Sequence, residues 1–410
     1  MFFLALAAGA AALLAAAAGC EREAPKPAGP GPAEADAPPP DWPMFHGGPD
    51  LRGAVAGRLP DALRVTWTFK TEGPVVGGAA VRSGRVFVGS GDYHLYALRL
   101  ADGRKRWSLA TEGEIKATPL VLPNRPPASG ETVYVGSTDG RLYAIDAQTG
   151  RLRWRYETDD QIAGSASALE LQADPTAGES AAATRTVVLV ASYDASLHAV
   201  DAETGRGLWR VETGNWINGA PALVPPTAPD APPLAVFGGC DGLLHFVDAA
   251  AGREVGTVDA GAYVAASPAV AEGRVFVGNV EGTLLCVEAA TRKVLWRLEA
   301  DQAQFFSTPA VGERAVFIGG RDRRLRAVDR RNGRVLWTFP TRGDVDSAPV
   351  VVGSRVLFGS RDGRLYMLRA DDGREVWSWD LGSAVVAPVA VAGRRVIVGT
   401  EDGTVFCFGP

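Results

Sequence analysis

The chain has 410 residues, of which 46% are hydrophobic and 22% are charged, a balance too apolar for a mainly disordered protein. Its 42 basic and 47 acidic residues give a formal net charge of −5, so it lacks the basic excess with which proteins bind nucleic acid. With 49 glycines and 28 prolines, the composition favours many short strands joined by turns over long helices.

The N-terminal part has the pattern of an export signal followed by a tether. Residues 1–19 form an apolar run that ends in small residues directly before Cys20, as in a cleaved signal peptide. Residues 20–40 are rich in Pro and Ala and predict a solvated tether. An uncleaved anchor helix is the alternative, but the polar residues after Cys20 argue against it. Residues 41–64 then form a lead-in segment before the repeated region, residues 65–410.

The residues around Cys20 resemble a lipoprotein signal. Ala17-Ala18-Gly19-Cys20 stands where the lipobox stands in bacterial lipoproteins, which implies that Cys20 carries the lipid. Met1-Phe2-Phe3 departs from such signals because it contains no Lys or Arg. Glu21 occupies the position at which an aspartate would imply retention in the inner membrane. We therefore expect a lipoprotein of the outer membrane that faces the periplasm.

A unit of about 40 residues recurs through the rest of the chain. Each unit contains four short β-rich stretches, and the turn between the second and third stretches carries an acidic residue. These residues are Asp92, Asp139, Asp194, Asp241, Glu281, Asp322, Asp362 and Asp402. Four strands in each of eight units predict an all-β fold, an eight-bladed β-propeller of four-stranded antiparallel blades.

The order of the stretches predicts how the ring closes. Residues 65–69 read as a fourth strand, whereas the last unit stops after its third strand near Phe408. We expect the N-terminal strand to complete the last blade, because this pairs an edge that would otherwise be open to aggregation. Three longer loops, at residues 123–130, 171–185 and 225–233, all fall between first and second strands, and we expect them to be solvated.

The run Ala144-Ile-Asp-Ala-Gln-Thr-Gly-Arg-Leu-Arg-Trp154 resembles the tryptophan-docking motif of the PQQ-like repeat propeller superfamily, Ala-x-Asp-x-x-x-Gly-x-x-x-Trp, and the runs ending at Trp209 and Trp337 repeat it. WD40 repeats are the rival, but Trp-Asp occurs once, at Trp379. A tryptophan docked between blades buries about 150 to 250 Å². We expect a structural role for Trp67, Trp107, Trp154, Trp209, Trp296, Trp337 and Trp377. Gly256 replaces the tryptophan of the fourth blade and should leave that blade the loosest.

Two classes within this superfamily compete. Quinoprotein dehydrogenases imply a PQQ cofactor, a calcium ion, a catalytic aspartate and a disulfide between adjacent cysteines, whereas no two cysteines are adjacent here. The other class is the BamB-like lipoproteins, which serve as scaffolds in outer-membrane β-barrel assembly. Lipobox, tether and blade number favour this class. We expect a monomeric, protein-binding scaffold that is not an enzyme and has no cofactor. A quinoprotein oxidoreductase, or a periplasmic relative of unknown role, is the alternative.

Neither the cysteines nor the histidines predict a metal site or a disulfide framework. The odd number of cysteines after Cys20, namely Cys240, Cys286 and Cys407, predicts free and buried thiols. His198 and His245 occupy the third-strand position that tyrosine occupies in other units, so we expect no metal there.

The segments that lead into the first strands suggest a partner-binding surface. An apolar residue lies four positions before a proline in most units (Ile115, Ile217, Val264, Phe305, Val345 and Ala384). Its neighbours vary, and aromatics gather on consecutive blades. The candidate partner-binding residues are Trp216, Asn218, Tyr263, Gln304, Phe306, Asp344 and Asp346. Ordinary core packing is the alternative, since aromatic residues are also common core fillers. The binding hypothesis rests on aromatics rimmed by polar groups, which anchor protein interfaces.

Overall fold

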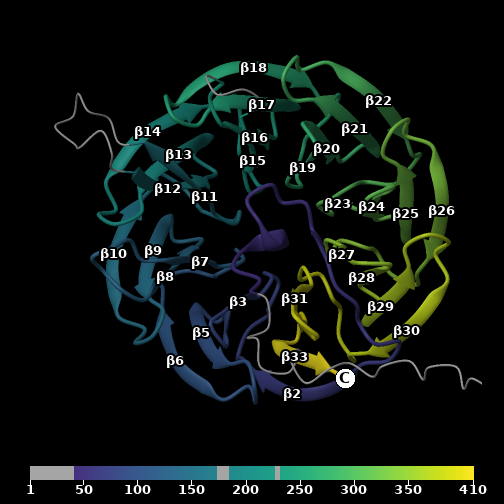
Figure 1. The fold of residues 1–410 in the computed structure, drawn as a ribbon, viewed down its shortest axis with the longest axis horizontal. Helices are drawn as coiled ribbons and strands as arrows, with labels where there is room; N and C mark the ends of the chain where they lie inside the picture. Colours follow the sequence, from purple (N-terminus) through teal and green to yellow (C-terminus); the bar gives the residue numbers. More distant parts are fainter. Residues whose placement is uncertain (1–40, 173–183, 227–230) are drawn as a thin grey trace, which may run out of the picture. The chain divides into compact units, whose positions relative to one another are not determined.

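The computed structural model describes residues 41–172, 184–226 and 231–410. The signal peptide, Cys20 and the tether lie outside the described residues, as do parts of the loops at 171–185 and 225–233. Within the unit Pro39–Pro410, the strands form eight sheets arranged as a ring (Figure 1). The described part contains no helix of the length and hydropathy needed to cross a membrane.

Each sheet is one blade, whose strands follow one another from the centre of the ring outward. Blade 1 consists of β3 (Ala80–Arg82), β4 (Arg85–Gly89), β5 (His94–Arg99) and β6 (Lys105–Ala110), and blade 2 of β7 (Leu120–Pro123), β8 (Glu131–Gly136), β9 (Arg141–Asp146) and β10 (Leu152–Glu157). Blade 3 consists of β11 (Ser167–Gln172), β12 (Thr184–Ala191), β13 (Ser196–Asp201) and β14 (Gly207–Glu212). Blade 4 consists of β15 (Ala222–Val224), β16 (Leu234–Gly238), β17 (Leu243–Asp248) and β18 (Arg253–Asp259). Blade 5 consists of β19 (Ala269–Ala271), β20 (Arg274–Gly278), β21 (Thr283–Glu288) and β22 (Val294–Glu299), and blade 6 of β23 (Ala310–Val311), β24 (Ala315–Gly320), β25 (Arg324–Asp329) and β26 (Val335–Pro340). Blade 7 consists of β27 (Val350–Val352), β28 (Arg355–Gly359), β29 (Arg364–Arg369) and β30 (Glu375–Asp380). Blade 8 consists of β31 (Ala390–Ala392), β32 (Arg395–Gly399), β33 (Thr404–Gly409) and β2 (Arg64–Lys70).

The burial of the strands follows their position in the blade. Second and third strands such as β4 and β5 are buried on both faces, because neighbouring blades cover them, and they read as nearly continuous apolar runs. Fourth strands such as β10 alternate between exposed and half-buried residues. The sequence pattern therefore reports the layer of the propeller in which a strand lies.

The predicted closure of the ring is confirmed. β2 pairs antiparallel with β33, from Val65 opposite Phe408 to Lys70 opposite Thr404, and completes blade 8. Figure 1 shows the first and last strands of the ring side by side. The outer edge of β33 is thereby paired.

The lead-in segment crosses the centre of the ring, which the sequence did not predict (Figure 1). It contains the short helix η2 (Phe45–Gly47) and β1 (Ala54–Val55), which adds to β27 in parallel and gives blade 7 a fifth strand. Its backbone carbonyls accept hydrogen bonds from the innermost strands of six blades. The donors are the amides of Val81, Val121, Leu223, Val270, Val311 and Val351. Trp42 and Leu51 are fully buried, so the segment is part of the core.

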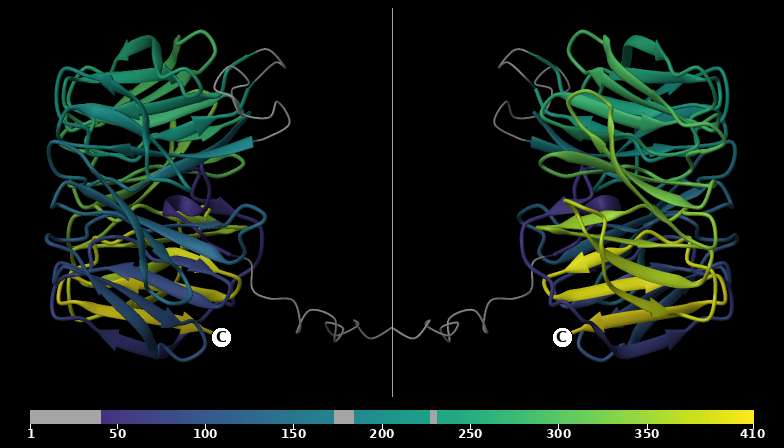
Figure 2. Two further views of the ribbon diagram at one scale, coloured as in Figure 1. Left: turned by 90° about the vertical axis from the view of Figure 1, so that its left-hand side faces the viewer. Right: turned by 90° about the vertical axis from the view of Figure 1, so that its right-hand side faces the viewer.

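The ring has two different faces. The lead-in face carries the lead-in segment, the turns between first and second strands and the turns between third and fourth strands; Figure 2 shows the ring edge-on with the lead-in segment toward this side. The connection face carries the second-to-third-strand turns and the connections between blades. These last two features are bonded together, as when the amide of Cys240 donates to the carbonyl of Trp216 over 2.8 Å.

The motif tryptophans lie against the next blade. The indole N–H of Trp154 donates to the carbonyl of Ala202 over 3.2 Å, and a Cβ on Gly205 would come within 2.6 Å of its ring. Gly205 has a φ of +73°, so this turn requires glycine for both conformation and space. The same hydrogen bond to the next blade is made by Trp67, Trp107, Trp296 and Trp337.

Three positions depart from this arrangement. The indole N–H of Trp209 is buried without a partner among the described residues. Trp377 faces the closure, where blade 8 has no third-to-fourth-strand turn, and contacts the edge of Phe408 with ring centroids 5.4 Å apart. At Gly256 the tryptophan is absent, and the side chain of Arg292 lies against the glycine instead. Arg292 itself replaces the motif glycine and has a φ of +61°.

Candidate protein-binding face

The seven candidate partner-binding residues all lie on the connection face, in the segments that lead into blades 4 to 7. Ile217, in the segment before blade 4, is fully buried, although the second strand of blade 3 ends in Ala191 rather than in glycine. In the segments before blades 5 to 7, a fully buried apolar residue fits against a glycine at the end of the second strand of the preceding blade, as Phe305 does at Gly278. This contact holds the segment in place and turns its neighbours toward the face. In blade 8 the buried residue is Val385, not Ala384 as the proline spacing predicted, because the segment is one residue shorter before Pro388.

Trp216 and Tyr263 are exposed on this face. The side chain of Trp216 is 53% exposed and that of Tyr263 is 56% exposed. Trp216 stacks on Tyr193, with ring centroids 5.3 Å apart and an interplanar angle of 5°. The amide nitrogen of Asn218 lies 3.0 Å from the thiol of Cys240 and fixes the other side of the segment. Sequence reasoning missed Tyr193, although its place beside Asp194 in the turn of blade 3 puts it on the same face.

Phe306 is less accessible than the other two aromatics. It is half-buried, and the guanidinium carbon of Arg321 lies 3.6 Å from the centre of its ring. Such cation–π contacts stabilise by about 0.5 to 2 kcal/mol. The carbonyl of the exposed residue Gln304 accepts from the amide of Arg321 over 3.2 Å. Arg321 therefore covers the ring of Phe306, which the sequence placed among the candidate partner-binding residues.

Asp346 is bound within an ion network. Its carboxylate accepts from Arg321 over 3.0 Å and from Arg361 over 2.9 Å, and only 9% of its side chain is exposed. Arg361 also pairs with Glu401 over 2.9 Å. The hydrogen bond to Asp346 raises the pKa of Arg361 above its usual range. Asp344 is half-buried, and its carbonyl accepts from the amide of Arg361. Asp346 thus positions two arginines rather than presenting a free charge.

Six of the eight acidic turn residues bind a side chain of the third strand four residues later. Tyr143 donates to Asp139 over 2.6 Å, and His198 lies 2.9 Å from Asp194. Burial, followed by the hydrogen bond to Asp139, raises the pKa of Tyr143 to about 12. The same pairing joins Asp92 to Tyr96, Asp241 to His245, Asp322 to Arg326 and Asp362 to Tyr366. These carboxylates hold the turns of the connection face.

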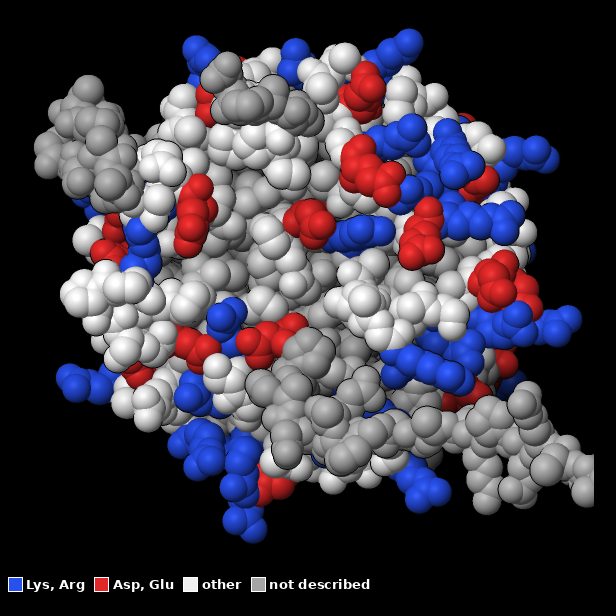
Figure 3. All heavy atoms as spheres, in the orientation of Figure 1, with Lys and Arg blue, Asp and Glu red and all other residues white. Residues whose placement is uncertain are grey.

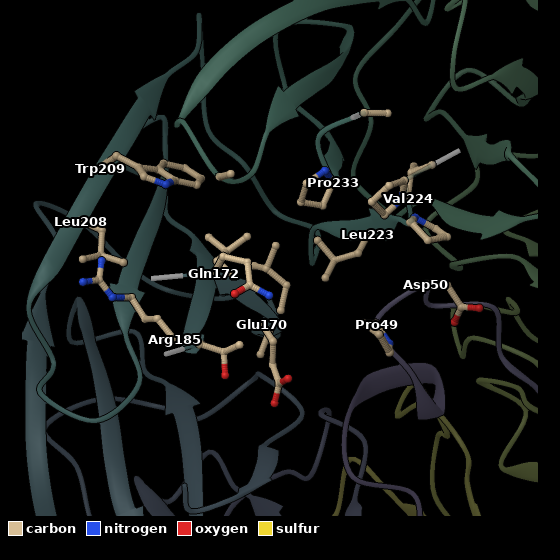
Figure 4. Close-up of a pocket in the computed structure, with 18 of the residues that line it drawn as sticks. Pro49, Asp50, Glu170, Gln172, Arg185, Leu208, Trp209, Leu223, Val224 and Pro233 are labelled. Atoms are coloured by element: carbon tan, nitrogen blue, oxygen red, sulfur yellow. The ribbon is translucent and has the colours of Figure 1, made fainter. Parts of the chain in front are cut away.

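A groove of about 1380 Å³ lies between blades 3 and 4 on the opposite, lead-in face (Figure 4). Pro49 and Asp50 of the lead-in segment form one wall, and Glu170 and Gln172 of β11 line another. Trp209 lines the outer end. The sequence signalled this region only through the two long loops that flank it.

The described residues do not fit a centre for PQQ and calcium. Cys240, Cys286 and Cys407 are free; Cys240 is partly exposed rather than buried, and burial raises the pKa of Cys286 to about 12. Within the described ranges, no three His, Cys, Asp or Glu side chains converge as a metal site would require. Buried side chains of the lead-in segment, including Phe45, occupy the centre of the ring.

Solved structures share this fold at low sequence identity. BamB from Moraxella catarrhalis is 19% identical with a TM-score of 0.66, and the match covers 85% of this chain and 98% of that one. Quinohemoprotein alcohol dehydrogenase from Comamonas testosteroni is 15% identical with a TM-score of 0.71, covering 90% and 80% of the two chains. The corresponding enzyme ADHIIG from Pseudomonas putida HK5 is 15% identical with a TM-score of 0.68, covering 91% and 80%.

The two dehydrogenases correct one expectation. The sequence led us to expect a chain that is not an enzyme, and this inference is overturned because the same propeller occurs in two alcohol dehydrogenases. A propeller fold alone does not decide whether its site carries catalysis.

The family follows from the sequence itself. No curated protein sequence matches the chain. One family profile, described as outer membrane protein assembly factor BamB, matches residues 61–179, 161–228, 240–346 and 321–408. These matches span most of the propeller. The chain belongs to the family of the outer membrane protein assembly factor BamB.

Proposed function

We propose that this protein is a periplasmic scaffold that binds protein partners in the assembly of outer-membrane β-barrel proteins and is held at the outer membrane by a lipid on Cys20. Family membership supports this role, since the family is described by outer-membrane assembly. The single observation that carries the binding proposal is the exposed Trp216 stacked on Tyr193 on the connection face.

The exposed pair has the properties of an interface anchor. A tryptophan presents about 200 Å² of surface, and covering the exposed half of Trp216 would contribute about 2.5 kcal/mol at about 25 cal/mol per Å². Because Tyr193 and the buried Ile217 already hold the segment, little side-chain freedom is lost on binding. Tyr263 adds a second exposed aromatic ring on the next blade.

The polar residues around the aromatics define the rest of the proposed surface. Asn218 and Gln304 offer amide groups beside the aromatics. Three other candidate residues, Phe306, Asp344 and Asp346, contribute to this surface through the arginines that they hold. Arg321 covers the ring of Phe306 and is paired with Asp346. Charged groups at such a rim influence the association rate and its salt dependence.

Affinity purification from solubilised membranes tests the role. We expect components of the β-barrel assembly machinery, identified by mass spectrometry, to co-purify with the tagged wild-type chain and to be reduced more than tenfold with Trp216→Ala. Trp379→Ala is the matched control, because Trp379 is also exposed but lies on the outer strand of blade 7. Equal recovery with both variants would remove Trp216 from the interface. Absence of the machinery from the wild-type sample would refute the proposed role.

A further inference from the structure

A polar pocket of about 550 Å³ lies on the lead-in face, where blade 1 meets blade 2. Its lining residues are Ser83, Gly84, Arg85, Arg99, Arg106 and Gln148. Three of them are arginines and none is acidic. Pockets of about 300 to 1,000 Å³ are typical of small-molecule ligands. The volume therefore suits an anionic group attached to a small organic body.

Two of these arginines lie opposite each other on the second and third strands, an arrangement that the described blades show only here and in blade 7, where Arg355 lies opposite Arg369. In the antiparallel pair β4 and β5, Arg85 lies directly opposite Arg99. Like charges at such positions destabilise a sheet. In blade 5 the equivalent pair is Arg274 opposite Glu288, which carry opposite charges. In blades 2, 3, 4 and 6 the third strand ends in Asp146, Asp201, Asp248 and Asp329. Arg99 replaces the aspartate of the repeat motif.

Arg106 loses its counterion through the same replacement. In blade 2 the residue directly before the docking tryptophan is Arg153, which donates to Asp146 over 2.8 Å. Arg106 occupies this place in blade 1, but the residue equivalent to Asp146 is Arg99. Arg106 is exposed, and its side chain makes no hydrogen bond or ion pair with the described residues. Its guanidinium is therefore free to bind a ligand.

The carboxylates near the pocket leave most of the arginine donors unused. Arg85 donates one hydrogen bond to Glu131 over 3.2 Å, and Glu131 is shared with Arg82 over 2.9 Å. Arg99 pairs with Asp102 through its Nε and one terminal nitrogen. Each guanidinium has five N–H donors, so several remain available on both side chains. Neither Glu131 nor Asp102 lines the pocket.

We propose that this pocket binds the phosphate of an organic phosphate, supplied by a phospholipid headgroup or by a small soluble phosphate ester. Guanidinium forks match phosphate oxygens in geometry and charge. A phosphate between the three arginines would also remove the repulsion between Arg85 and Arg99. Lys and Arg side chains project from the part of the lead-in face where β6 lies (Figure 3). This site is separate from the connection face and goes beyond the proposed scaffold role.

Two variants and a control test the site in the full chain carrying Cys20→Ala, so that an attached lipid cannot anchor the protein. Arg106→Ala removes one charged donor and should weaken binding by about tenfold. Arg99→Asp restores the motif residue, which should pair with Arg106 and abolish binding. Arg253→Asp is the control, since it makes the same change in net charge as Arg99→Asp at an exposed position, the first residue of β18 in blade 4, on the same face.

Two probes distinguish the sources of the phosphate. Glycerol phosphate is titrated by calorimetry at constant ionic strength, and phosphatidylglycerol in phosphatidylcholine vesicles is tested by co-sedimentation. Binding of glycerol phosphate assigns a soluble ligand, whereas binding to vesicles alone assigns a lipid headgroup. Either result supports the site if Arg106→Ala weakens the binding and Arg253→Asp does not. The proposal is wrong if the wild type binds neither probe, if Arg106→Ala binds as the wild type does, or if Arg253→Asp loses binding equally.

Discussion

The motif tryptophans and the exposed Trp216 should differ sharply in their effect on stability. Trp154→Ala removes a ring packed between blades 2 and 3 and its hydrogen bond to Ala202. Covering about 120 Å² of ring contributes about 3 kcal/mol, and the hydrogen bond adds about 1 kcal/mol. We expect Trp154→Ala to lower the free energy of unfolding by about 4 kcal/mol. Trp216→Ala should cost under about 1 kcal/mol, because half of that side chain is already exposed.

Trp209 provides an internal comparison. Its ring lies against Gly252 as that of Trp154 lies against Gly205, but its indole N–H has no partner among the described residues. Trp209→Ala should therefore cost about 1 kcal/mol less than Trp154→Ala, the contribution of one hydrogen bond. The order of destabilisation is Trp154→Ala, then Trp209→Ala, then Trp216→Ala.

Differential scanning calorimetry measures this order. A unit of roughly 370 residues has an unfolding entropy of about 0.8 kcal/mol per degree, so the three variants should lower the Tm by about 5, 4 and 1 °C. If Trp216→Ala lowered the Tm as much as Trp154→Ala, Trp216 would belong to the core and its proposed role as an interface anchor would fall.

Three further predictions concern closure, pH and the membrane. Deleting the chain through Phe69 removes most of β2, which exposes the edge of β33, and also the lead-in segment that fills the centre of the ring. The truncated protein should therefore melt lower, and the open edge of β33 should make it self-associate. A monomer in size-exclusion chromatography with unchanged melting would contradict this. Burial lowers the pKa of His46 to about 4. Between pH values of about 4 and 6.5 the unfolded chain therefore binds more protons than the folded chain. As the pH drops through this window, the free energy of unfolding should fall by up to ~3 kcal/mol. His46→Asn, which suits the φ of +55° at this position, should flatten the dependence in melting curves, and an unchanged slope would exclude His46 as its source. Cys20→Ala should move the protein from the membrane fraction to the soluble fraction; membrane retention of the variant, without lipid mass on the wild-type N-terminus, would refute the lipid anchor.

Much of the propeller was readable because each unit repeats the same local chemistry. The alternation of strands and turns, the motif from Ala144 to Trp154, and the fourth-strand character of residues 65–69 predicted eight blades and their closure. Each of these features depends on residues close together in one unit, so periodicity and turn chemistry were sufficient. The one-residue error at Ala384 arose because proline spacing is a weaker marker than the buried contact of Val385 with Gly359.

The candidate site was only partly predictable from the sequence, because its contacts join residues that are not close together in one unit. The sequence placed Trp216, Tyr263 and Phe306 on one face, but it could not show that Tyr193 supports Trp216 or that Arg321 covers Phe306. These contacts join residues of different blades, and no local pattern encodes them.

The sequence by itself determined the repeat, the number of blades and the family, because these depend on local patterns that recur along the chain. Only the tertiary structure showed that the lead-in segment fills the centre of the ring and that Arg85, Arg99 and Arg106 line one pocket. The physical reason is that closing the ring brings neighbouring blades and the N-terminal segment into contact. Burial and charge at these junctions depend on side chains that lie far apart in the sequence.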